Sequence, residues 1–178
     1  MDTDIPKIKL IVIGDTEVGK TCILESLINN TFLEEYKPTI GINFLVKTIQ
    51  IDNKDIKLLN YDTSGQEQYK SFIPGLAKES KIILLVYEIT SKNSFLHLND
   101  FLNILTEVKK EDVIFVLIGN KKDLEDKREV STEEAEKFAK DNGYLFVEIS
   151  AKTGDIFSQL FNETLVEKIK TKLNLGEQ

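Results

Sequence analysis

The amino-acid sequence predicts a three-layer α/β domain around a mostly parallel sheet, with about six strands and about five helices. Three observations lead to this fold class: short apolar runs recur along the chain, segments of helical periodicity separate them, and two further runs flank a turn-forming cluster. Because the recurring runs are apolar almost throughout, they are typical of parallel strands covered on both faces and joined by right-handed crossovers. These runs are residues 7–13, 81–87, 113–118 and 144–149.

One antiparallel hairpin is expected at an edge of the sheet. Residues 42–51 and 55–61 are the two candidate strands, and Asp52-Asn53-Lys54 between them favours a tight turn. The sheet is therefore expected to be mixed rather than wholly parallel.

Helix ends are marked by residues with specific terminal roles. Ser131-Thr132-Glu133-Glu134 has the form of a capping box, and Gly143 is placed to end the same helix in a left-handed conformation. The last helix is expected to place an apolar stripe on the sheet, with its members at i,i+4 spacing. These members are Phe157, Phe161, Leu165, Ile169 and Leu173.

Composition bounds the number of domains, the partners and the compartment. With 178 residues, 41% of them hydrophobic, we expect one domain over residues 7–173 between tails at 1–6 and 174–178. The net charge of −7 disfavours nucleic acid as a partner. The single cysteine, Cys22, forms no intrachain disulfide, and no apolar run approaches the ~20 residues that span a bilayer. A soluble, cytoplasmic protein is expected.

A phosphate-binding motif follows the first predicted strand. Residues 14–21 fit the pattern G-x-x-x-x-G-K-[ST], and a helix is expected to begin near Lys20. Glycines let backbone N–H groups converge on phosphate oxygens, and the helix N-terminus adds its positive dipole end. Lys20 supplies charge to the β- and γ-phosphates, and Thr21 offers a hydroxyl oxygen to Mg²⁺. The expected nucleotide-binding residues here are Gly14, Asp15, Thr16, Glu17, Val18, Gly19, Lys20, Thr21 and Cys22, the last packing beneath the loop.

A second motif bears on the choice between adenine and guanine, which the phosphate motif alone leaves open. Asn120-Lys121-Lys122-Asp123 follows the strand predicted at 113–118, where open α/β sheets place their ligands. The Asp123 carboxylate can accept the N1–H and the exocyclic amino group of guanine, whereas adenine presents an acceptor at N1. Ser150-Ala151-Lys152 could supply a backbone N–H for guanine O6. The expected base-site residues are Asn120, Lys121, Asp123, Ser150, Ala151 and Lys152.

Together with two further motifs, these residues resemble the Ras superfamily of small GTPases, and in detail the Rab family, over residues 7–169. The further motifs are Tyr36-Lys37-Pro38-Thr39-Ile40-Gly41 and Asp62-Thr63-Ser64-Gly65-Gln66, and the Rab-like detail is Ile40-Gly41-Ile42-Asn43-Phe44. The resemblance implies a P-loop G domain that switches between GTP and GDP with Mg²⁺, in a Rab-like role as a regulator of vesicle trafficking. It also assigns expected contacts: Thr39 and, through water, Asp62 hold Mg²⁺, the Gly65 amide contacts the γ-phosphate, Phe32 stacks on guanine, and Tyr36 is a further nucleotide-binding candidate.

The same resemblance implies slow GTP hydrolysis. Gln66 is expected to orient the attacking water, while Lys20 and Mg²⁺ stabilise charge. Neither switch offers an obvious arginine to the phosphates, so a GTPase-activating protein is expected, together with an exchange factor and effectors. The chain ends without a cysteine for prenylation, so we expect attachment to the cytosolic face of endomembranes only through a tail that this chain lacks.

Departures from the family pattern keep two alternatives open. Ser64 replaces the usual alanine, Tyr61 replaces the tryptophan of typical Rab proteins, and Thr16 adds bulk near the transition state. A non-hydrolysing GTP-binding module is therefore one alternative, which turnover would separate from the enzyme. A P-loop kinase or ATPase is the other, which Asp123 opposes and competition between GTP and ATP would test. His97 is expected only on a helix surface.

Overall fold

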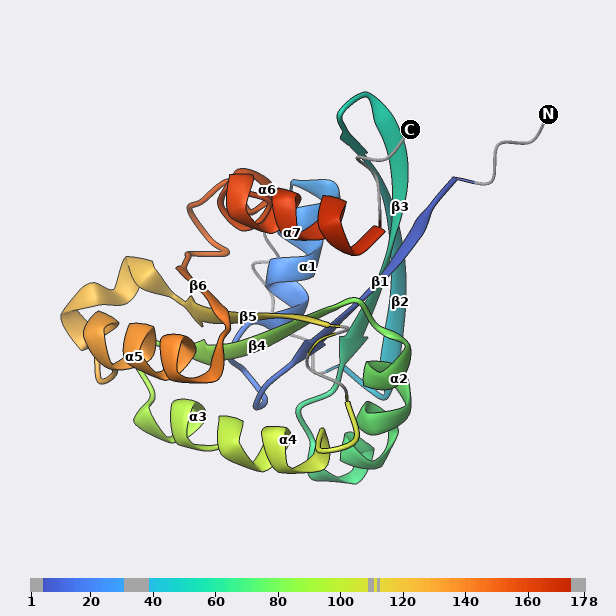
Figure 1. Ribbon diagram of the computed structural model, residues 1–178. Helices are drawn as coiled ribbons and strands as arrows, with labels where there is room; N and C mark the ends of the chain where they lie inside the picture. The colour runs from blue at the N-terminus through green and yellow to red at the C-terminus, as the bar shows by residue number, and fades with distance from the viewer. Residues whose placement is uncertain (1–4, 31–38, 109–110, 112, 174–178) are drawn as a thin grey trace.

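The computed structural model describes residues 5–30, 39–108, 111 and 113–173, and it has the three-layer α/β fold that the sequence predicts (Figure 1). Its six-stranded sheet runs in the order β2-β3-β1-β4-β5-β6. β2 and β3 pair antiparallel and all other neighbours pair parallel, so the predicted mixed sheet with one edge hairpin is confirmed. The strands are β1 (Lys7–Ile13), β2 (Ile42–Ile51), β3 (Lys54–Thr63), β4 (Ile82–Glu88), β5 (Ile114–Asn120) and β6 (Leu145–Glu148).

Helices cover both faces of the sheet and bury one apolar cluster on each side (Figure 1). The central strands β1, β4 and β5 contribute alternate side chains to both clusters, which explains why their sequences are apolar almost throughout. None of the described helices is long and apolar enough to cross a membrane. The first face carries α1 (Lys20–Asn29), α6 (Ile156–Leu160) and α7 (Glu163–Leu173), and the second carries η1 (Glu67–Phe72), α2 (Ile73–Glu79), α3 (Lys92–Leu96), α4 (Leu98–Ile104) and α5 (Thr132–Asn142).

The hairpin turn has the backbone conformation that its sequence favours. Asp52 and Asn53 have φ angles of 50° and 61°, which match the twist of the flanking strands. Pairing involves all 10 residues of each strand, so β3 extends beyond the predicted 55–61 at both ends. This extension places Asp62 opposite Val12 at the end of β1, beside the start of the phosphate motif.

The predicted ends of α5 are present. Ser131 Oγ accepts a hydrogen bond from the Glu134 N–H at 3.1 Å, and Gly143 ends the helix with a φ of 73°. The Glu134 carboxylate forms an ion pair with Lys92, which fastens the start of α5 to α3. The residues of the capping box therefore stabilise the start of α5 and also hold it against α3.

The prediction of one continuous last helix is wrong, because the structure has two helices there, α6 and α7. Phe161 leaves helical geometry with φ −88° and ψ 48°. Asn162 Oδ1 then accepts the Leu165 N–H at 3.1 Å and begins a new helix. A side-chain acceptor that competes for backbone N–H groups is the physical reason for the break. His97 separates α3 from α4 although its backbone stays in the right-handed helical region, with φ −65° and ψ −12°. The described chain therefore has seven α-helical segments, where about five were predicted.

Candidate nucleotide-binding site

The phosphate motif forms the loop between β1 and α1, at the carboxyl end of a central strand. The helix begins at Lys20, as predicted, and Gly19 precedes it with a φ of 93°. A Cβ atom on Gly19 would lie 2.3 Å from Asn120 Nδ2, so both its conformation and the close approach of the base loop require glycine here. The loop is thereby joined to the start of α1 and pressed against the loop after β5.

Lys20 lies beneath the phosphate loop rather than in solvent. Its side chain is buried, and Nζ donates a hydrogen bond to the Asp15 carbonyl oxygen. Burial lowers the pKa of Lys20 to about 8, an effect that the nearby Asp62 and Asp15 carboxylates partly oppose. An ammonium group desolvated in this way is stabilised by an anion, and a phosphate group would supply one.

The three residues expected to hold Mg²⁺ converge in the structure. Thr21 Oγ1 lies 2.8 Å from Thr39 Oγ1 and donates a 2.6 Å hydrogen bond to Asp62 Oδ2. Thr39 Oγ1 lies 3.3 Å from the same carboxylate oxygen. Adjacent ligands of an octahedral Mg²⁺ at about 2.1 Å are separated by about 3.0 Å, so the two threonine oxygens fit neighbouring coordination positions.

Asp62 is the charged member of this cluster. Its side chain is fully buried, and Oδ1 has no hydrogen-bond partner within the described part of the chain. Burial raises the pKa of Asp62, whereas its hydrogen bond from Thr21 and the charge of Lys20 lower it. The described residues contain no group of three or more His, Cys, Asp or Glu side chains that could hold a metal alone. A cation here would thus need the threonine hydroxyls, this carboxylate and oxygens from a ligand.

Asn120 connects the base loop to the phosphate loop. Its Nδ2 donates to the Val18 carbonyl oxygen at 2.9 Å, and its Oδ1 accepts the Ala151 N–H at 3.1 Å. The side chain is only 2% exposed, so these bonds form in a low-dielectric environment. One amide therefore joins the loops after β1, β5 and β6.

Asp123, the last residue of the predicted base motif, lies in η3 (Lys122–Lys127). Its Oδ1 accepts a 2.6 Å hydrogen bond from Ser150 Oγ, which orients the carboxylate. Lys121 adopts a left-handed φ of 63° and pairs with Glu88, so its aliphatic chain is held over this end of the sheet. Ala151, one of the three residues 150–152 expected to supply an N–H to guanine O6, donates its N–H to Asn120 Oδ1 in this structure.

The second switch motif packs directly on the phosphate loop. A Cβ atom on Gly65 would lie 2.3 Å from the Thr16 nitrogen and 2.4 Å from the Asp15 carbonyl carbon. The Ser64 N–H donates to the Gly41 carbonyl oxygen at 3.0 Å, which joins the two switches. Gln66, expected to orient water, is half-buried at the end of this turn, and its Oε1 accepts from Gln68 Nε2 at 3.2 Å.

Three of the predicted nucleotide-binding residues are not among the contacts given above. Phe32 and Tyr36 lie outside the described residues. Cys22 is half-buried against the apolar cluster on the α1 face, and burial raises the pKa of its thiol. Sequence reasoning missed His97, whose Nδ1 lies 2.6 Å from Asp15 Oδ2, because 82 residues separate the two and no local pattern connects them.

Comparison with known families agrees with this geometry. A sequence model described as the Ras family matches residues 9–171. The chain belongs to the Ras family. Ras-family small GTPases are nucleotide-binding switches.

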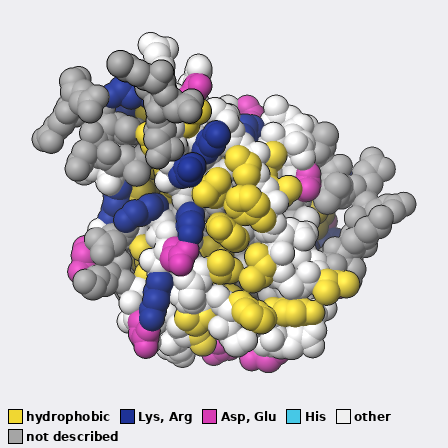
Figure 2. Space-filling model, turned by 90° about the vertical axis from the view of Figure 1, so that its right-hand side faces the viewer, with side chains coloured by type: hydrophobic (Ala, Val, Ile, Leu, Met, Phe, Trp, Pro, Cys, Tyr) yellow, Lys and Arg dark blue, Asp and Glu magenta, His cyan; other side chains and the backbone are white. Residues whose placement is uncertain are grey.

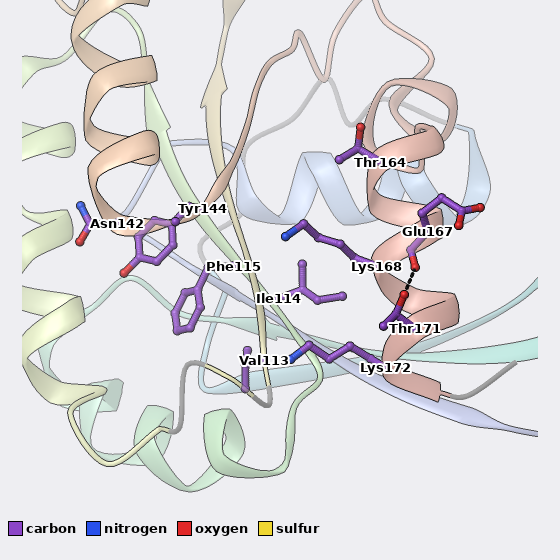
Figure 3. A pocket seen from close by; sticks show the side chains of 11 residues that line it. Val113, Ile114, Phe115, Asn142, Tyr144, Thr164, Glu167, Lys168, Thr171 and Lys172 are labelled. Atoms are coloured by element: carbon purple, nitrogen blue, oxygen red, sulfur yellow. Dashed lines mark hydrogen bonds between the residues drawn. The ribbon is translucent and has the colours of Figure 1, made fainter. Parts of the chain in front are cut away.

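A separate hollow of about 480 Å³ lies elsewhere on the Ras-family domain (Figure 3). It is lined by the start of β5, the end of α5 and one side of α7. Lys168 extends from α7 toward the Phe115 and Tyr144 rings, which stack at 4.9 Å. The start of a parallel strand is opposite to its carboxyl end, and the hollow contains none of the predicted site residues.

Proposed function

We propose that this Ras-family chain is a guanine-nucleotide switch that binds GTP and GDP with Mg²⁺ and hydrolyses GTP slowly. The observation that carries the proposal is the convergence of Thr21, Thr39 and Asp62 beside the phosphate loop. Thr21 lies in the first turn of α1, whereas Thr39 lies in the segment before β2, so a γ-phosphate and cation would hold that segment in place. Loss of the γ-phosphate would release it, which is the basis of a switch.

The guanine preference is proposed from Asp123. Its carboxylate is oriented by Ser150 and can accept both N1–H and the exocyclic amino group of guanine. Adenine would place its N1 acceptor against the carboxylate and leave both groups unpaired, which can reduce binding by about 10⁴-fold. Ala151 contributes by donating its N–H to Asn120 Oδ1 at 3.1 Å, which supports the proposal by holding the loop after β6 beside the base motif.

For hydrolysis, Gln66 is proposed to orient the attacking water and Lys20 to stabilise charge on the phosphates. Bound Mg²⁺ would supply further positive charge. Arg128 is the only arginine in the sequence, and it is already engaged in a two-point ion pair with Glu148 and in another with Glu125. No arginine is therefore free to act on the phosphates, and a GTPase-activating protein is expected to provide one.

A partner-binding face next to the switches supports the effector proposal. Figure 2 shows hydrophobic side chains gathered on the side of the domain formed by the β2–β3 hairpin and α2. Phe44 is 53% exposed and packs on Tyr61 at a ring distance of 5.1 Å. Ile40 lies in the first switch motif and Phe72 at the end of η1, which follows the second, and both are also exposed. Exposed aromatic residues of this kind mark protein-binding surfaces, and here their arrangement would depend on the nucleotide.

A finer proposal concerns the cellular role and the domain limits. We propose a Rab-like regulator of vesicle trafficking, on the basis of residues 40–44, and a single domain over residues 7–173. Tyr61 stands where typical Rab proteins carry tryptophan, so a different set of effectors from theirs is expected. Expected partners are effectors, an exchange factor and the activating protein.

Single-turnover hydrolysis of preloaded GTP with Mg²⁺ tests the proposal, with wild type and Gln66→Leu measured side by side. Turnover by the wild type that is lost in the variant, with ATP unable to compete for binding, supports the switch and the role of Gln66. Tight GTP binding without turnover in either protein would instead indicate a non-hydrolysing binding module. Equal competition by ATP would overturn the guanine assignment of Asp123.

A further inference from the structure

Ser64 lies at the centre of the turn that carries Gln66. Its side chain is only 3% exposed, and its Oγ accepts a hydrogen bond from the Gln66 N–H at 3.2 Å. The Gln66 carbonyl oxygen accepts the Tyr69 N–H at 3.0 Å. Both backbone polar groups of Gln66 are thus satisfied, one by Ser64 and one by the first turn of η1.

The same turn is anchored to three other parts of the site. Thr63 Oγ1 donates to the Val12 carbonyl oxygen at 2.6 Å, and the Ser64 N–H donates to Gly41 in the first switch. Gly65 has no room for a side chain against the phosphate loop. The backbone is therefore fixed up to Gly65, and among the described contacts the Ser64 hydroxyl extends this fixed region to Gln66.

We infer that Ser64 is a positioning residue for Gln66, an inference that rests on the proposed GTPase function. An alanine at this position could not accept the Gln66 N–H. The hydroxyl thus limits the backbone freedom of the residue that must hold an attacking water, and orientation of this kind contributes directly to the rate of phosphoryl transfer. The substitution of serine for the usual alanine is in this view a functional adaptation rather than a neutral change.

A double-mutant cycle tests the inference with the full chain loaded with GTP and Mg²⁺. Ser64→Ala is expected to slow single-turnover hydrolysis about three- to tenfold, the effect of losing one hydrogen bond of ordinary strength. In a Gln66→Ala background the same substitution should change the rate less than about twofold, because no oriented side chain remains. Where the wild type turns over GTP, equal effects in both backgrounds, or an unchanged or faster rate in Ser64→Ala alone, would overturn the inference.

The matched control is Ser80→Ala at the end of α2. Ser80 is also buried, at 2% exposed, and its Oγ donates to the Leu76 carbonyl oxygen at 2.8 Å, away from the phosphate loop. This variant should lose stability comparably but hydrolyse GTP at the wild-type rate. A slowing equal to that of Ser64→Ala would mean that general loosening, not positioning, explains the effect.

Hydrogen exchange of the Gln66 amide distinguishes failure of this inference from failure of the proposed function. Ser64→Ala should raise that exchange rate severalfold in the nucleotide-loaded protein, whether or not the chain turns over GTP. A wild type without turnover but with a protected Gln66 amide that Ser64→Ala exposes would refute the GTPase proposal alone. Unchanged exchange would refute the positioning role of Ser64.

Discussion

His97 Nδ1 lies 2.6 Å from Asp15 Oδ2, so the residue between α3 and α4 contacts the second residue of the phosphate loop. The His97 side chain is 52% exposed and that of Asp15 is 24% exposed. A pair this accessible to water adds little to folding stability. It nevertheless connects the loop expected to enclose the phosphates to a helical layer packed on the opposite side of the sheet from α1.

His97→Ala should accelerate nucleotide release about two- to fivefold while changing the free energy of unfolding by less than about 1 kcal/mol. The reason is that the phosphate loop loses a lateral restraint but no buried contact. Dissociation of a fluorescent GDP analogue measures the first effect and chemical denaturation the second.

Two variants control the His97 experiment. His97→Asn keeps a side-chain nitrogen near the Asp15 carboxylate and should release nucleotide at close to the wild-type rate. Lys137→Ala breaks the exposed Lys137–Asp141 pair on α5 and should have no effect on release. If His97→Ala and Lys137→Ala release nucleotide at the same rate, the contact between His97 and the phosphate loop does not affect nucleotide release.

Gly65→Ala should abolish or strongly reduce hydrolysis, because its Cβ would lie 2.3 Å from the Thr16 nitrogen and force the second switch away from the phosphate loop. Gly75→Ala is the matched control in α2, since a Cβ there would meet nothing within 4 Å. In a helix interior that change should be neutral or stabilise by up to about 1 kcal/mol. Hydrolysis and thermal unfolding of both proteins check the contrast, and a fully active Gly65→Ala would contradict the packing described.

Asn120→Ala should destabilise the protein by about 2–4 kcal/mol, because the Val18 carbonyl and the Ala151 N–H both lose a buried partner. Nucleotide should also dissociate much faster, since three loops are no longer joined. Asn142→Ala is the control: its Nδ2 donates to the Phe138 carbonyl oxygen in a partly exposed position, so we expect a loss below about 1 kcal/mol. Urea denaturation distinguishes the two, and similar losses would contradict the role of Asn120.

Asp123→Asn should shift the base preference from guanine toward xanthine. An asparagine offers one acceptor and one donor, which match the N1–H and O2 of xanthine, whereas guanine presents donors at both positions. Ser150 Oγ can still donate to the asparagine oxygen, so the side chain should keep its orientation. Competition between GDP and XDP for a fluorescent nucleotide measures the change, and an unaltered preference would remove Asp123 from the base site.

The mixed sheet with its antiparallel edge hairpin could be predicted from the sequence, as could the loops that carry the phosphate and base motifs. Their signals are local: apolar runs that must be buried on both faces, glycines followed by Lys20 and Thr21, and the turn at Asp52 and Asn53. Such patterns can be recognised from residues that are close in the sequence, because each one reflects the backbone geometry or the burial of a single strand, helix or turn.

The tertiary structure alone decided how distant side chains meet. The pair between His97 and Asp15 joins residues 82 positions apart. The division of the last helix at Asn162 depended on whether a side chain would compete with the backbone, and periodicity does not decide that. The family resemblance predicted that Thr21, Thr39 and Asp62 share a site, but their distances are set only when α1, the first switch and β3 pack together. Contacts between segments are set by the packing of the whole domain, and a linear pattern carries no record of that packing.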